Sequence, residues 1–101
     1  MRLTSKQIEI MQKIKDGNPD GSKIDITQLR LSLSYSATKQ AVLCSVNVLI
    51  NRSLVAHSGR ETRKGRVHTT VELTALGRAH IESYVESLKS ALIEDEDELD
   101  D

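Results

Sequence analysis

The sequence predicts one small, mainly helical α+β domain, and three observations lead to this prediction. Apolar residues recur with helical spacing in residues 8–14, 42–49 and 81–92. Between the second and third of these stretches, residues 54–58 and 67–73 alternate as half-buried strands do. A chain of 101 residues is long enough for one thin core, which must be built from Ile, Leu and Val because Phe and Trp are absent.

The first expected helix begins at Thr4 and ends near Asp16 or Gly17. Thr4 and Gln7 form a capping-box pattern, in which each side chain satisfies a backbone amide of the other residue. A turn-rich loop, residues 17–22, follows and contains the only proline. We expect this helix to support the domain rather than to carry its function.

A short second helix is expected next, capped by Asp25 or Thr27. Leu29, Leu31 and Leu33 are all expected to find contacts in the core. The serines that alternate with the last leucines compete for backbone hydrogen bonds and end the helix. With the segment that follows, this helix would form a helix-turn-helix.

The third expected helix covers residues 36–51, with Ser36 as its N-cap and no Gly or Pro inside it. Val42, Val46 and Leu49 recur at i, i+4 and i+7, which predicts one buried stripe. Another side of the helix carries Lys39, Gln40, Leu43 and Asn47. The helix therefore has one apolar face and one partly polar face.

A basic hairpin follows this helix. Residues 54–58 and 67–73 are the expected strands, and residues 59–66 are the expected loop. Four cations against one anion give the loop a local charge of +3: Arg60, Arg63, Lys64 and Arg66 against Glu61. Thr74 can cap the helix that comes after the hairpin.

One long helix is expected over residues 75–93. Its apolar residues fall at i, i+4, i+7 and i+11, the spacing of a coiled-coil seam: Ile81, Val85, Leu88 and Leu92. A narrow seam at the edge of a small domain favours packing against a second chain, so we expect these four residues to hold a homodimer together. The alternative is that the seam covers its own domain.

The charge is divided unevenly along the chain. The last eight residues hold seven of the fifteen acidic residues and no base. Residues 1–93 therefore carry 14 basic and 8 acidic residues, a net charge of +6, which suggests a polyanion as partner. Residues 94–101 have no periodic apolar face and repel one another, so we expect them to be disordered. This tail either improves solubility or competes with phosphates for the basic body.

The order of helix, basic hairpin and a helix entry of the form Leu-Thr-x-x-Gly-Arg, residues 73–78, resembles the winged-helix DNA-binding domains, most closely the MarR-type regulators. The resemblance covers roughly residues 4–92. It implies a winged helix-turn-helix with a three-helix core, a β-hairpin wing and a C-terminal dimerisation helix, and it places Ile24 in a short strand beside the hairpin.

The resemblance also implies where DNA binds. Helix 36–51 would enter the major groove, and the wing, residues 59–66, would reach the backbone or the minor groove. The candidate DNA-binding residues are Thr38, Lys39, Gln40, Leu43 and Asn47 on the helix, and Arg60, Arg63, Lys64 and Arg66 on the wing. Asn and Gln can pair with adenine, Lys can donate to guanine, and flexible cations suit phosphates. A transcriptional regulator of double-stranded DNA is therefore expected, and the sequence leaves open whether its binding represses or activates.

A second function stays open beside this one. The helix over residues 36–51 carries a single charge and is unusually apolar, with Leu43, Val48 and Ile50. The same fold could be a protein–protein interaction module without sequence-specific DNA binding. Binding measured at several salt concentrations distinguishes the two functions, because the affinity for duplex DNA falls steeply with salt and the affinity of an apolar protein interface barely changes.

Three residues are candidates for reactive groups. Cys44 is expected to be a small structural residue rather than an oxidation sensor. His57 and His68 would lie opposite each other if Ser58 pairs with Val67, giving a two-ligand metal site or a pH-sensitive pair. Solvated histidines are the simpler expectation, and no metal site is expected.

No enzyme signature is present, since the chain has no phosphate-cradling glycine loop, no HExxH, no CxxC and no nucleophile elbow. We therefore expect no catalytic residue and no cofactor. A single cysteine and the lack of a stretch of about 18 apolar residues predict a cytoplasmic protein that does not enter the membrane. The expected division is a DNA-binding domain at 1–74, a dimerisation helix at 75–93 and a disordered acidic tail at 94–101. The sequence names no operator and no effector ligand.

Overall fold

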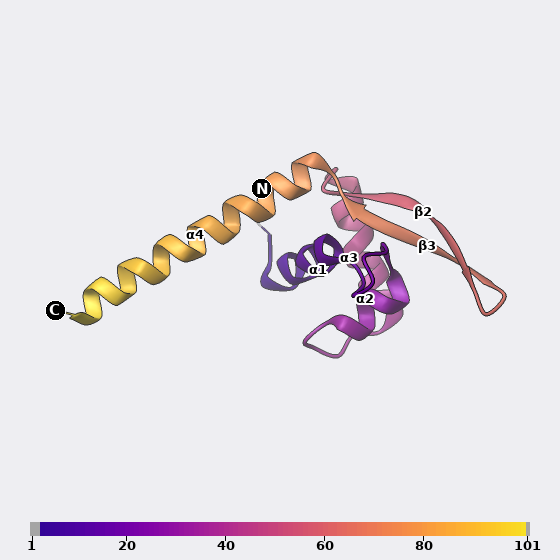
Figure 1. The fold of residues 1–101 in the computed structure, drawn as a ribbon, viewed down its shortest axis with the longest axis horizontal. Coiled ribbons are helices and arrows are strands. Elements are labelled where there is room, and N and C mark those ends of the chain that lie inside the picture. The colour runs from indigo at the N-terminus through magenta and orange to yellow at the C-terminus, as the bar shows by residue number, and fades with distance from the viewer. Residues whose placement is uncertain (1–2, 101) are drawn as a thin grey trace.

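The described residues form a three-helix core, a β-hairpin and a long C-terminal helix (Figure 1). The structure, a computed structural model, describes the backbone of residues 3–100 and the side chains of residues 3–88. The elements are α1 (Ser5–Asp16), β1 (Ile24–Asp25), α2 (Ile26–Ser32), α3 (Lys39–Asn51), β2 (Val55–Arg63), β3 (Arg66–Leu73) and α4 (Ala75–Asp100). The strands form an antiparallel sheet in the order β1-β3-β2. This confirms the expected α+β winged-helix class, including the short strand at Ile24.

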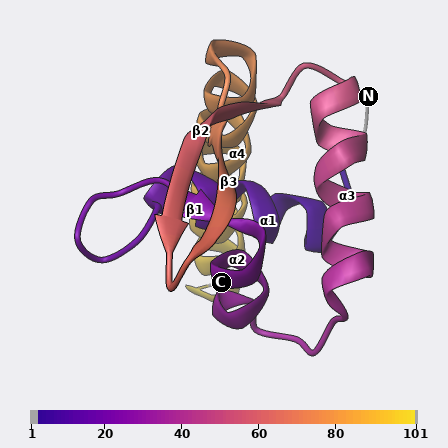
Figure 2. The same ribbon diagram turned by 90° about the vertical axis from the view of Figure 1, so that its right-hand side faces the viewer.

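The core lies among α1, α2 and α3 and is closed by the sheet. Figure 2 shows α3 on one side of the domain and the β2–β3 hairpin on the other, with α1 and α2 between them. Aliphatic side chains and one methionine fill the core: Ile8, Ile10, Met11, Ile14, Ile24, Leu29, Val42, Val46, Leu49, Leu54, Val55, Val71, Leu73 and Ile81. Because these side chains come from all three helices, the sheet and α4, the core fixes the positions of α3 and the wing together.

The first helix begins and ends where its sequence predicts. The hydroxyl of Thr4 accepts from the amide of Gln7 at 3.1 Å, and the Gln7 side-chain oxygen accepts from the Thr4 amide at 2.9 Å. Gly17 ends the helix with a φ of 68°, a left-handed conformation that glycine adopts without strain.

The second helix is capped by Asp25, one of its two expected caps, but it leaves one leucine in solvent. Leu29 is fully buried, Leu33 packs at the edge of the core, and Leu31 is 71% exposed. The expectation that all three leucines find core contacts is therefore wrong for Leu31. The helix is regular, so positions i and i+2 point to nearly opposite sides, and Leu29 occupies the side that faces the core.

The third helix begins later than the sequence suggests, with Thr38 rather than Ser36 as its N-cap. The Thr38 hydroxyl accepts from the Ala41 amide at 3.1 Å. The preceding segment is held out of the helix by α1, because the backbone amide and the hydroxyl of Ser34 both donate to the Glu9 carboxylate at 2.6 Å. These hydrogen bonds, the hydroxyl's foremost, hold the pKa of Glu9 below its ordinary value.

The hairpin is longer and its turn is tighter than expected. The basic residues 59–66 are not a loop, because β2 runs to Arg63 and β3 starts at Arg66, which pairs with it. Only Lys64 and Gly65 form the turn, with φ values of 51° and 76°. Positive φ at both central residues is the conformation that matches the twist of a two-residue hairpin. The cations therefore lie on a paired ribbon with a defined register.

The fourth helix is tied to the start of the wing. The Thr74 hydroxyl accepts from the Gly77 amide at 3.0 Å, which confirms Thr74 as the cap, and it donates to the Ser53 carbonyl at 2.6 Å. A side chain at Gly77 would have its Cβ 2.1 Å from the carbonyl oxygen of Leu54. Glycine is therefore required at this position, since the backbone of Leu54 lies directly against the helix.

The backbone of α4 is helical through Asp100, and the disorder expected of residues 94–101 stays a prediction. Their sequence contains no Gly or Pro, and glutamate is a good helix former. The helix leads away from the core in the direction opposite to the wing (Figure 1). The division at positions 74 and 93 stays a prediction. Among the described residues, no helix has both the length and the apolar content that crossing a membrane requires.

Candidate nucleic-acid interface

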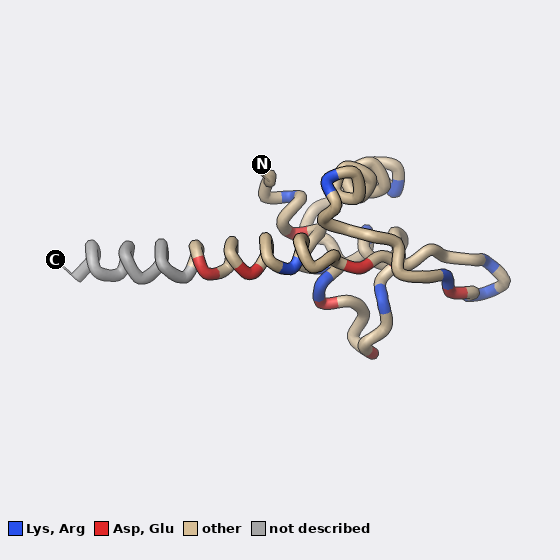
Figure 3. Tube along the Cα trace, turned by 90° about the horizontal axis from the view of Figure 1, so that it is seen from above, with Lys and Arg blue, Asp and Glu red and all other residues tan. Residues whose placement is uncertain are grey.

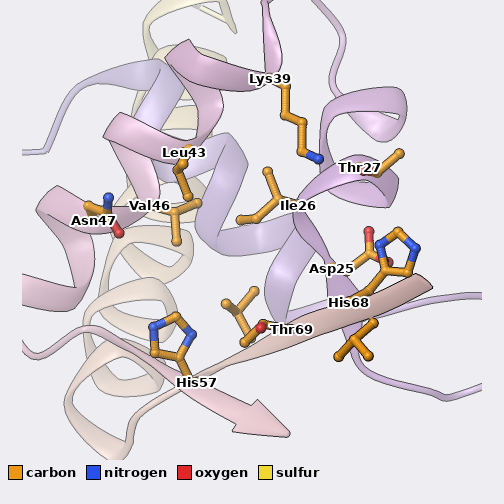
Figure 4. A pocket seen from close by; sticks show the side chains of 12 residues that line it. Asp25, Ile26, Thr27, Lys39, Leu43, Val46, Asn47, His57, His68 and Thr69 are labelled. Atoms are coloured by element: carbon orange, nitrogen blue, oxygen red, sulfur yellow. The ribbon is translucent and has the colours of Figure 1, made fainter. Parts of the chain in front are cut away.

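The outer face of α3 and the β2–β3 hairpin, outside residues 59–66, border a shared hollow of about 260 Å³ (Figure 4). Lys39, Leu43 and Asn47 approach it from α3, and His57 and Thr69 approach it from the hairpin. The hollow thus joins three helix candidates to the hairpin, but none of the four wing candidates, Arg60, Arg63, Lys64 and Arg66, lines it. The common side of α3 and the hairpin is a continuous surface with a helix on one flank and a ribbon on the other.

The helix presents its expected face to solvent. Val42, Val46 and Leu49 are buried, as the periodicity predicts. The exposed side chains of α3 include the expected Lys39, Gln40, Leu43 and Asn47. Thr38 is also exposed; its hydroxyl accepts from the Ala41 amide as the N-cap and keeps its proton and one lone pair for an outside partner.

The apolar part of α3 is smaller than its sequence suggests. Leu43 and Val48 are 37% and 39% exposed, whereas Ile50 packs against the core. Cys44 is exposed, and the Gln40 side-chain nitrogen lies 3.8 Å from its sulfur. The outer face of α3 is therefore a mixed surface in which single apolar side chains alternate with polar ones.

The wing exposes three of its four cations. Figure 3 shows basic residues gathered around the tip of the hairpin, with an acidic residue among them. Arg60, Lys64 and Arg66 are exposed. Arg63 is different, because its guanidinium forms an ion pair with Asp25 and its side chain is 32% exposed. Of the four wing candidates, three are free to meet phosphates and one is engaged within the protein.

Asp25 is the interface residue whose second role the sequence did not reveal. Its side chain caps α2 by accepting from the Gln28 amide at 2.8 Å, and the Asp25 amide donates to the Gln28 side-chain oxygen at 3.1 Å. Its other oxygen faces Arg63 and lies 3.6 Å from Nδ1 of His68. The only sequence signal for Asp25 was its suitability as a cap.

The two wing histidines do not lie opposite each other. His57 pairs with Val71, and His68 pairs with Glu61. The expected register, Ser58 with Val67, is wrong because the tight turn sets the pairing from the tip, and a bulge between His57 and Gly59 shifts it again. Among residues with described side chains, no group of three metal-binding side chains is present.

The expected dimerisation seam is only partly available to a partner. Ile81 belongs to the core of its own domain, and Val85 packs against that core. Leu88 is 44% exposed, and the side chain of Leu92 is outside the described residues. A second hollow of about 290 Å³ lies where α4 meets the start of the chain, lined by Leu3, Ile8, His80, Ile81, Ser83, Tyr84 and Ser87. A partner chain would therefore meet α4 from Val85 onward.

Comparison with known proteins places the fold among MarR-type winged helices. No family model and no curated protein matches the sequence. Among solved structures, wild-type MarR from Escherichia coli without ligand aligns with a TM-score of 0.63 and 21% identity over 80% of this chain and 54% of that one. The adhesin competence repressor AdcR from Streptococcus pyogenes aligns with a TM-score of 0.66 and 20% identity over 97% and 65%.

A third similar structure contains nucleic acid. FabT from Streptococcus pneumoniae, in complex with DNA, aligns with a TM-score of 0.66 and 18% identity over 94% of this chain and 61% of that one. The chain thus spans between 54% and 65% of the length of these three proteins. The fold is that of a MarR-like winged helix.

Proposed function

We propose that this chain, which has the MarR-like winged-helix fold, is a transcriptional regulator that binds duplex DNA. The observation that carries the proposal is the surface shared by α3 and the β2–β3 hairpin, whose tip carries the exposed cations. An α-helix with its side chains is about 10–12 Å across, which fits a major groove about 12 Å wide. With α3 in the groove, the exposed cations of the wing extend to one side of it, where the phosphates of the neighbouring backbone run.

In this proposal α3 reads bases and the wing supplies affinity. Gln40 and Asn47 are exposed amides that can pair bidentately with adenine, and Lys39 can donate to guanine. Arg60, Lys64 and Arg66 are exposed cations that can donate to phosphate oxygens from several directions, so they suit contacts with the DNA backbone.

The proposal includes a homodimer joined through α4. A two-fold dimer presents two copies of α3 to half-sites about 34 Å apart, one turn of DNA. Leu88, on α4 just beyond Val85, is exposed and available for this contact. Repression in the cytoplasm is the proposed action, on the precedent of the adhesin competence repressor, whose name states that role.

The test is a fluorescence anisotropy titration of the full chain on mixed duplexes across a salt series. Duplex binding should weaken with a log–log slope of about −0.9 for each phosphate contacted. Binding that is absent at low salt would overturn the proposal. A duplex affinity indifferent to salt would also overturn it, and would favour a protein partner on Leu43 and Val48, the exposed apolar residues of α3.

A further inference from the structure

One buried carboxylate connects the wing to the helix-turn-helix. Asp25 is 2% exposed and lies at the junction of β1 and α2. One oxygen caps α2, and the other faces Arg63 from β2 and His68 from β3. Figure 4 shows the Asp25 carboxylate beside the His68 ring. Both strands of the wing therefore meet α2 at a single side chain.

We infer that Asp25 is a positioning residue that holds the wing at a set distance from α3, and that Arg63 serves this contact rather than a phosphate. The inference rests on the proposed function, because it concerns how the DNA-binding surface is prepared. α2 packs directly against α3, so an anchor on the first turn of α2 is also an anchor relative to α3.

Arg63 lies near the tip of the hairpin, where a contact restrains the motion of the wing most. Arg63 is the last residue of β2, directly before the Lys64–Gly65 turn. The ribbon extends beyond the core (Figure 1), and an isolated two-stranded ribbon twists and bends readily. A contact near the tip limits that motion far more than one near the base. Lys64 directly follows Arg63 and Arg66 pairs with it across the hairpin, so anchoring Arg63 also places these two exposed cations.

The charge balance keeps Arg63 on Asp25. A carboxylate that is almost fully buried is costly to leave without a counter-charge. The His68 ring lies 3.6 Å from the same carboxylate, and the Glu61 carboxylate lies 4.0 Å from Nε of Arg63. A phosphate that took Arg63 would strip Asp25 of its permanently charged partner. The exposed wing cations carry no such cost when they bind DNA.

The variant Asp25→Asn separates anchoring from capping, because Asn caps helices as well as Asp does. Positioning and bulk electrostatics predict opposite results for it. Removing an acid from a DNA-binding domain should tighten binding through charge alone. Loss of the anchor should instead raise Kd roughly tenfold, a coupling typical of residues in one ion-pair network, with the salt slope unchanged.

A measurement without DNA tests the anchor itself. In the unmodified chain the backbone order parameter of the Gly65 amide should be near about 0.85, and in Asp25→Asn it should fall below about 0.6. Arg63→Met should also lower the Gly65 order parameter, and it should leave the salt slope unchanged. This second variant tests the anchor even if Asp25→Asn fails to fold. Lys64→Met is the matched control: it should lower the slope by about 0.9 and leave Gly65 ordered.

The inference would be overturned by unchanged or tighter DNA binding by Asp25→Asn, by a slope reduced by about 0.9 in Arg63→Met, or by a Gly65 amide that stays ordered in both variants. Loosening of Gly65 in Lys64→Met would also overturn it, since any change near the tip would then have that effect. If the unmodified chain binds no duplex, the proposed function fails, yet the order of Gly65 still decides whether Asp25 holds the wing.

Discussion

Replacing Lys64 and Arg66 together by alanine tests whether the wing supplies non-specific affinity. Both side chains are exposed, and neither has an ion-pair partner among the described side chains. Each phosphate contact contributes about 0.9 to the slope of log K against log salt, so the double variant should flatten the slope by about 1.8. When salt rises fourfold, the unmodified chain should therefore lose roughly twelve times more affinity than the double variant loses.

The assay is fluorescence anisotropy with a labelled duplex at salt concentrations from about 50 to 200 mM, the range in which this dependence is steep. A random duplex and a preferred duplex should lose affinity by similar factors, because phosphates are the same in both. The control removes two charges elsewhere: Lys13 and Lys15 in the last turn of α1, replaced by alanine. An unchanged slope in the wing variant, or an equal change in the control, would refute the assignment of the wing to phosphates.

Three further changes test other parts of the structure. Gly77→Ala should destabilise the fold by about 3 kcal/mol, because its Cβ would overlap the Leu54 carbonyl, and a thermal melt should show a Tm lower by roughly 12 °C. Asn47→Ala should change sequence preference at a cost of about 1–3 kcal/mol, seen by comparing duplex variants; equal losses on all duplexes would contradict base reading. Leu88→Glu should yield monomers with weaker DNA binding in sedimentation, and a monomeric unmodified chain at tens of micromolar would disprove the dimer.

Local rules of the sequence determined the elements and their faces. The capping box of Thr4 and the stripe of Val42, Val46 and Leu49 depend on contacts within a few residues of the same helix. The basic character of the wing is likewise a property of adjacent residues. These features could be predicted because neighbours in sequence are neighbours in space in helices and hairpins.

The ends and registers of the elements needed the tertiary structure. Ser36 is as good a cap as Thr38 by its chemistry, and the contact of Ser34 with Glu9 on α1 decides between them. The hairpin register followed from the conformation of the turn and from a bulge, because alternating strands tolerate several pairings.

The roles of the four wing cations also depended on the tertiary structure. In sequence, Arg60, Arg63 and Lys64 are equivalent members of one basic run. In the fold, Arg63 alone of the wing cations meets the buried carboxylate of Asp25, which lies 38 positions earlier in the chain. The sequence determined that the hairpin is basic. Only the packing of β1 against β3 brought that carboxylate under the wing, and a long-range contact of this kind leaves no local signal in the chain.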